Sequence, residues 1–66
     1  MKLIINGDEK IVDDNKSINE IMIDLQIIDK VMACAVNMDI VKKENWESYV
    51  PKENDKIELL QFVGGG

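Results

Sequence analysis

One segment of this 66-residue chain has the spacing of an amphipathic helix, and short strand-like segments lie on both sides of it. It opens with Ser17-Ile18-Asn19-Glu20, which matches a capping box, so a helix is predicted to begin at Ile18. Apolar residues then recur at intervals of three and four, namely Ile18, Ile21, Met22, Leu25 and Ile28. A single helix cannot bury such a face by itself, so this face must pack on a sheet.

The strand-like segments predict how that sheet is built. The first 13 residues favour a β-hairpin around the turn signal Gly7-Asp8. Further strands are expected at residues 32–37, 40–41 and 56–63. Between the last two, residues 42–51 predict an irregular connection whose aromatic side chains, Trp46 and Tyr49, cover an edge of the core. The order β-β-α-β-β-β predicts an α+β fold, with one main helix on one face of a sheet of four to five strands.

Length and charge exclude several classes of function. Sixty-six residues hold one domain, expected over residues 1–63, with residues 64–66 as a flexible glycine tail. Thirteen acidic residues against eight lysines give a net charge of −5, which argues against nucleic acid as a partner. One cysteine and no histidine cannot complete a zinc site, so no metal site is expected. The apolar run at residues 3–5 is too short for a signal peptide or a membrane span, so no membrane partner is expected either.

Cys34 is the only cysteine of the chain. It cannot form an intrachain disulfide, which favours a reducing compartment and hence a cytoplasmic protein. The chain has neither histidine nor arginine to stabilise a thiolate. Cys34 is therefore interpreted as a small buried hydrophobic residue rather than a nucleophile.

The last predicted strand is apolar on both faces. Alternation places Ile57 and Leu59 on one face, and Leu60 and Phe62 on the other. If the helix covers the first face, Leu60 and Phe62, joined by Ile4 from the first strand, form a docking patch on an open sheet surface. The connection at residues 42–51 could instead cover them, and the sequence leaves both arrangements open.

The chain ends in Gly64, Gly65 and Gly66, which follow the last strand directly. A segment without Cβ atoms is thin, and it ends in a free carboxylate. At about 3.3 Å per residue, residues 63–66 could reach roughly 13 Å beyond the sheet, enough to enter another protein's active site through a narrow channel. The alternative is a frayed terminus without a function.

Taken together, these motifs resemble the ThiS family, the ubiquitin-like sulfur carriers of thiamine biosynthesis. The resemblance covers essentially the whole chain and rests on Asn6-Gly7, Ser17-Ile18-Asn19-Glu20-Ile21, Ala35-Val36-Asn37, Ile40-Val41, Trp46, Asp55-Lys56-Ile57-Glu58 and Phe62-Val63-Gly64-Gly65-Gly66. It implies a β-grasp fold with a mixed sheet. It also implies a carrier that is not itself an enzyme and that holds no stably bound cofactor.

The resemblance further implies a role for the terminal residues. A ThiF-like adenylyltransferase would use ATP and Mg²⁺ to adenylate Gly66, and a cysteine persulfide protein would supply sulfur to form a thiocarboxylate there. A ThiG-like thiazole synthase would then receive the sulfur. Gly64 and Gly65 would give the tail passage, and the residues expected to contact partners are Ile4, Leu60, Phe62 and Val63. Two alternatives remain open: a molybdopterin-synthase sulfur carrier subunit, and a ubiquitin-like protein modifier or binding module.

Overall fold

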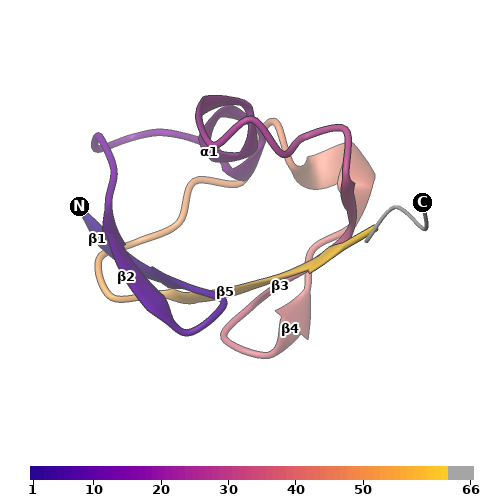
Figure 1. Ribbon diagram of the computed structural model, residues 1–66. Coiled ribbons are helices and arrows are strands. Elements are labelled where there is room, and N and C mark those ends of the chain that lie inside the picture. The colour runs from indigo at the N-terminus through magenta and orange to yellow at the C-terminus, as the bar shows by residue number, and fades with distance from the viewer. Residues whose placement is uncertain (63–66) are drawn as a thin grey trace.

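The computed structural model describes residues 1–62, which form a five-stranded sheet with one α-helix on one of its faces (Figure 1). The strands are β1 (Lys2–Ile5), β2 (Asp8–Ile11), β3 (Val31–Val36), β4 (Asp39–Ile40) and β5 (Lys56–Gln61). The helices are α1 (Ile18–Asp24) and a short 3-10 helix, η1 (Lys43–Asn45). The α+β class and the order of the elements are confirmed. No helix among these residues is long and apolar enough to cross a membrane.

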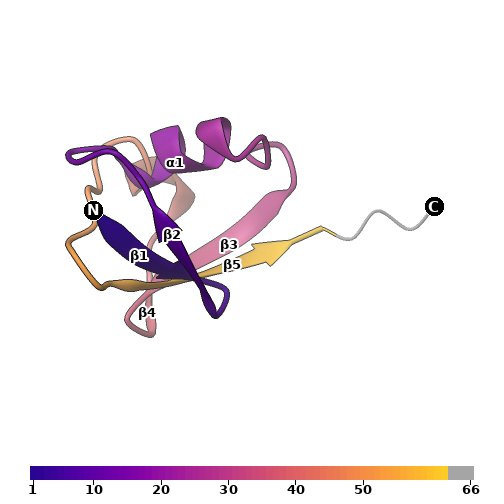
Figure 2. The same ribbon diagram turned by 60° about the vertical axis from the view of Figure 1, so that its left-hand side comes forward.

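Strand β5 comes last in the sequence but lies at the centre of the sheet, whose order is β2-β1-β5-β3-β4. It pairs in parallel with β1 and antiparallel with β3, so the sheet is mixed. Figure 2 shows β5 leading out of the sheet toward the carboxyl-terminal side of the molecule. Because β5 has a neighbour on each side, the sheet fixes its direction and its register.

Two tight hairpins flank this centre, and both turn through consecutive residues with positive φ. The predicted first hairpin is present, but its turn residues are Asn6 (50°) and Gly7 (87°) rather than Gly7 and Asp8, because Asp8 already pairs with Ile5 as the first residue of β2. Asn37 (49°) and Met38 (74°) join β3 to β4. This is the backbone pattern of type I′ turns, which suits the twist of paired strands. Met38 is unusual at such a position, because left-handed backbone is unfavourable for a residue with a Cβ atom.

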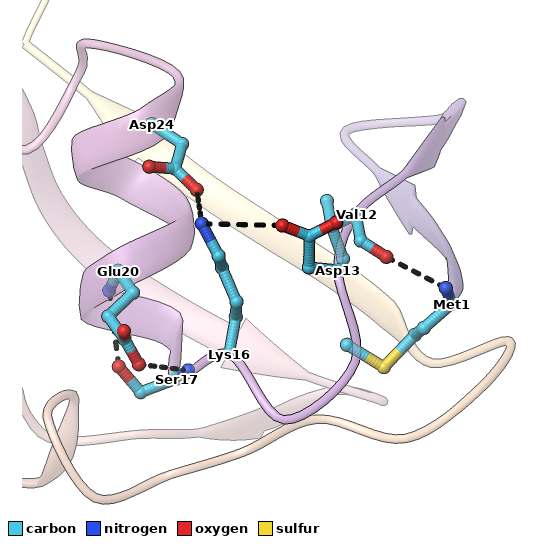
Figure 3. A network of polar contacts seen from close by, with 7 residues as sticks. All are labelled: Met1, Val12, Asp13, Lys16, Ser17, Glu20 and Asp24. Carbon is cyan, nitrogen blue, oxygen red and sulfur yellow. Dashed lines mark hydrogen bonds and ion pairs between the residues drawn. The ribbon is translucent and has the colours of Figure 1, made fainter.

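Helix α1 begins at the predicted residue. The Ser17 Oγ accepts a hydrogen bond from the Glu20 N–H at 3.1 Å, and the Glu20 Oε1 accepts one from the Ser17 N–H at 3.0 Å (Figure 3). The predicted capping box is therefore present in full. Ser17 is buried, so the reciprocal bonds satisfy polar groups that water cannot reach.

The helix ends earlier than the apolar spacing suggested. Asp24 is its last residue, Leu25 is the C-cap, and Gln26 takes a left-handed conformation with φ 62°. Leu25 and Ile28 are still partly buried against the core, but Ile28 packs there from the connection to β3. The prediction of Ile28 as part of the helical face is wrong. The helix ends at Asp24, and the residues that follow it still bury apolar side chains, so the apolar spacing extends beyond the helix.

An ionic contact ties the segment before the helix to its last residue. The Lys16 Nζ contacts the carboxylate of Asp24 and lies 3.9 Å from Asp13 Oδ2 (Figure 3). The hydrogen bond and charge of Asp24 raise the pKa of Lys16 above its ordinary value. Nearby, the Met1 ammonium donates to the Val12 carbonyl at 2.7 Å, which holds the start of β1 against the residue that follows β2.

The core lies between α1 and the inner face of the sheet. Its buried apolar members are Leu3, Ile5, Ile18, Ile21, Met22, Val31, Cys34, Val36, Val41, Trp46, Ile57 and Leu59. Trp46 is 1% exposed and its Nε1–H donates to the Val41 carbonyl at 2.9 Å, so it covers the core edge as predicted. Tyr49 does not, since 37% of it is exposed. The short strand also differs from the expected residues 40–41: β4 begins one residue earlier, and Val41 turns into the core.

Candidate functional site

Strand β5 separates its side chains into a buried set and an exposed set, as alternation predicted. Ile57 and Leu59 are 2% and 7% exposed, whereas Leu60 and Phe62 are 61% and 59% exposed. Phe62 lies one residue beyond the strand, and its N–H donates to the Lys30 carbonyl at 2.6 Å. Phe62, the last described residue, is therefore hydrogen-bonded to the connection before β3.

The exposed residues belong to an open sheet face, which we define by Ile4, Ala33, Ala35, Ile40, Leu60 and Phe62. The pairings Ala33 with Leu60 and Ala35 with Ile40 place these side chains on one side of the sheet. Ile4 is only partly exposed, but alternation along β1 places it on the same side, opposite buried Leu3 and Ile5. Helix α1 lies on the other side of the sheet (Figure 1).

The connection at residues 42–51 does not cover this face. It bonds instead to the start of α1: the Ile18 N–H donates to the Tyr49 carbonyl at 2.9 Å, and the Asn19 N–H donates to the Trp46 carbonyl at 3.1 Å. Trp46 thereby packs on the helix side of the sheet. Of the two arrangements that the sequence left open, the exposed one is present in the structure.

The middle of the open sheet face is hollowed. Ala33 and Ala35 contribute small side chains between the larger Ile40 and Leu60, leaving a shallow hollow of about 320 Å³. Ile40 is 72% exposed. The sequence analysis did not assign Ile40 and the two alanines to this face, because their position depends on how β3 and β4 pair. The alternation of Ala33, Cys34 and Ala35 along β3 could have indicated that the two alanines share the face opposite Cys34.

The open sheet face has no net charge, although the whole chain carries −5. Its charged neighbours are Lys2 and Lys56, balanced by Glu9 and Glu58. The excess of acidic residues therefore lies on the rest of the molecule. An apolar surface without a net charge can be desolvated against another protein at lower cost than a charged one.

Asn6 holds β5 in place just before the chain leaves the sheet. The Leu59 N–H donates to the Asn6 Oδ1 at 2.8 Å, and the Asn6 Nδ2 donates to the Leu59 carbonyl at 3.3 Å. The side-chain amide thus replaces the main chain of β1, which has ended at Ile5. Sequence reasoning recognised Asn6 only as a turn residue.

Cys34 is 1% exposed within the core. Burial raises the pKa of its thiol to about 11, so the thiolate is disfavoured at neutral pH. This agrees with the interpretation of Cys34 as a buried hydrophobic residue. Val63, Gly64, Gly65 and Gly66, which the sequence analysis assigned to partner contact, passage and sulfur attachment, lie outside the described residues.

Fold and site together define a small ubiquitin-like domain that presents an apolar sheet face beside the exit of its carboxyl-terminal segment. Comparison with known proteins identifies the family. The profile of the ThiS family matches residues 3–66. The sulfur carrier protein ThiS of Bacillus subtilis is 32% identical over 65 residues, which are 97% of this chain and 98% of that protein. The chain belongs to the ThiS family of sulfur carrier proteins.

Two further similarities bear on the fold and on partners. The crystal structure of the thiamine biosynthesis protein ThiS from Geobacter metallireducens superposes with a TM-score of 0.79 at 27% identity, and the match covers both chains completely. This confirms the expected β-grasp fold. A protein from Paramagnetospirillum magneticum named thiazole synthase is 30% identical over all 66 residues. The match spans only 20% of the length of that protein.

Proposed function

We propose that this protein carries sulfur for thiazole formation in thiamine biosynthesis, with its terminal Gly66 as the point of attachment. A ThiF-like adenylyltransferase converts the Gly66 carboxylate to an acyl-adenylate with ATP and Mg²⁺. The outer sulfur of a cysteine persulfide protein attacks the acyl-adenylate and displaces AMP, which gives an acyl disulfide. A second thiol attacks the donor cysteine sulfur, so the donor leaves as a disulfide and Gly66 is left as a thiocarboxylate. The thiocarboxylate donates its sulfur to a ThiG-like thiazole synthase. The observation that carries this proposal is the match to the ThiS family over residues 3–66, which include the terminal glycines.

The chain acts as a substrate of its partners. A carboxylate is a poor electrophile, and its activation requires cationic groups around the phosphates of ATP. The chain has eight lysines but no glycine-rich phosphate-binding loop followed by a helix, and its one thiol is buried with a raised pKa. Catalysis is therefore supplied by the partners. A buried, reduced thiol also accords with work in the cytoplasm.

The partners dock on the open sheet face. Leu60 and Phe62 are its most exposed members on β5 and beside it, and Ile4 extends it toward β1. We assign Val63 to the same contact, since it follows Phe62 directly. The relative named thiazole synthase supports this partner, because a domain similar to this whole chain lies within that protein.

Intact-mass spectrometry tests the proposal. After coexpression with the adenylyltransferase and a sulfur donor, the protein should gain about 16 Da as sulfur replaces one oxygen at Gly66. Deletion of Gly65 and Gly66 should abolish the gain. Adducts on lysines of other proteins would indicate a modifier instead, and sulfur delivery to molybdopterin synthase but not to thiazole synthase would indicate the other carrier class.

Two charged variants test the docking face. Leu60→Asp and Phe62→Asp should weaken binding to the adenylyltransferase much more than they lower the free energy of unfolding, because an exposed face tolerates charge and a desolvated interface does not. Ile23→Asp is the matched control and should bind normally, because Ile23 is also an exposed apolar residue but lies on α1, on the other side of the sheet. A Leu60→Asp protein that accepts sulfur at the wild-type rate would contradict this assignment.

A further inference from the structure

The side of β5 that faces β1 loses its partner strand before β5 ends. On this side the Ile4 N–H donates to the Asp55 carbonyl at 3.0 Å, and the Asn6 N–H donates to the Ile57 carbonyl at 2.9 Å. The chain then turns away at Gly7 into β2. Two residues further along β5, the main chain of Leu59 is hydrogen-bonded by the Asn6 side chain. This is the last contact that β1 or its turn makes with the main chain of β5 within the described residues.

Gln61 is the next residue of β5 whose main chain faces this side. Main-chain groups of a strand point alternately to its two neighbours. Leu60 pairs with Ala33, and the Phe62 N–H donates to the Lys30 carbonyl, so the amides on both sides of Gln61 face β3. The N–H and C=O of Gln61 therefore face away from β3. Within residues 1–62, no hydrogen bond joins them to β1, to its turn or to the connection after α1.

A hollow of about 280 Å³ lies beside this part of β5. Leu25 and Ile27 form its apolar wall on the helix side, where they are partly buried against the core. Asn6 and Lys10 line it on the side of the hairpin. The hollow thus occupies the place that β1 would have filled had it continued past Ile5.

We propose that this hollow receives an extended segment of the adenylyltransferase, which pairs with the Gln61 main chain as an added strand. Free N–H and C=O groups at the edge of a strand are recognised by another extended backbone, and an adjoining apolar wall accepts its alternate side chain. Leu25 and Ile27 provide that wall. The inference rests on the proposed function, in which the adenylyltransferase is the first enzyme to act on Gly66.

Two observations favour this enzyme segment over a second copy of the same chain. The hollow is adjacent to Gln61, where β5 passes into the segment that carries Gly66, so it is continuous with the proposed docking site. Each copy also carries a net charge of −5, which opposes self-association.

Amide hydrogen exchange tests the pairing directly. The exchange of the Gln61 N–H should slow at least about tenfold when the ¹⁵N-labelled protein binds the adenylyltransferase, because a new hydrogen bond protects it. Glu9 is the matched control: the Val12 N–H donates to the Met1 carbonyl, so by alternation the Glu9 N–H lies on the outer edge of β2, away from the hollow. Its exchange should not change. Unchanged exchange at Gln61 in a complex that forms would overturn the inference.

Proline substitution provides a second test. Gln61→Pro removes only a donor that β3 does not use, so the variant should unfold at the same urea concentration as the wild type. It should bind the enzyme roughly tenfold more weakly, as expected for a lost hydrogen bond and an obstructed strand edge. Gln61→Ala keeps the N–H and should therefore bind more tightly than Gln61→Pro. Wild-type affinity of a folded Gln61→Pro protein would also overturn the inference. If this variant does not fold, the exchange experiment decides.

The two proposals fail separately. A protein that gains the sulfur mass while Gln61 stays unprotected retains the proposed function and loses the added strand. A protein that shows neither the mass gain nor binding loses both. Protection of Gln61 that grows with the protein's own concentration, without enzyme, would assign the hollow to a second copy and overturn the inference.

Discussion

Leu59 and Leu60 are adjacent, identical residues with opposite environments, so truncating each to alanine tests the orientation of β5. Leu59 is 7% exposed within the core, and removal of a buried leucine costs about 2 to 5 kcal/mol of unfolding free energy. A chain of this length has roughly 3 to 10 kcal/mol in total. Leu59→Ala should therefore leave a marginally stable protein. Leu60 is 61% exposed, and its truncation should change the unfolding free energy by less than about 0.5 kcal/mol.

Urea unfolding followed by tryptophan fluorescence measures both variants. Trp46 is the only tryptophan and is 1% exposed, so its emission reports the loss of the core. With a slope of about 1 kcal/mol per molar urea, Leu59→Ala should lower the midpoint by about 2 M or more, while Leu60→Ala leaves it nearly unchanged. Leu60→Ala should instead weaken adenylyltransferase binding. Equal losses of stability in the two variants would refute the assignment of the faces and, with it, the docking site.

Two further predictions concern backbone strain and the buried thiol. Met38→Gly should raise the unfolding free energy by about 1 kcal/mol, because φ is 74° there, and Gln26→Gly at φ 62° should act alike; a lower urea midpoint in both would contradict this. Burial raises the pKa of Cys34 from its ordinary 9.0 to about 11, so the folded state holds this proton more tightly than the unfolded state. That contribution is complete below pH 9 and is lost as the pH rises toward 11. The difference in urea midpoint between the wild type and Cys34→Ala should therefore shrink over this range, and a constant difference would be evidence against the raised pKa.

The parts of the fold that the sequence predicts are those that depend on neighbours along the chain. The capping box located the start of α1 because Ser17 and Glu20 are three residues apart and act on each other. The end of α1 has no comparable local signal. Gln26 occupies the left-handed position where glycine is usual, and Ile28 continues the apolar spacing from outside the helix. The apolar periodicity correctly indicated that Ile28 packs against the core, but it placed Ile28 in the helix instead of the connection that follows.

The parts of the fold that the sequence does not predict depend on pairing between segments that are far apart in the chain. Alternation assigned Leu60 and Phe62 to one face of β5, but only the register of β3 and β4 brings Ile40 to the same face. The role of Asn6 depends likewise on its contact with Leu59, 53 residues away. The sequence therefore predicts the part of the open sheet face on β5 and β1, and misses the part that β3 and β4 contribute.

The central position of β5 has a mechanical consequence. Under the proposed function, an enzyme that draws the terminal glycines into its active site pulls on a strand that is paired with β3 over its length and with β1 over its first residues. A pull along the strand axis loads these crosswise bonds together, in shear, whereas an edge strand would peel away one bond at a time. On this proposal, the pairing of β5 lets the partner enzymes hold the carrier by its terminal residues without separating the strand from the sheet.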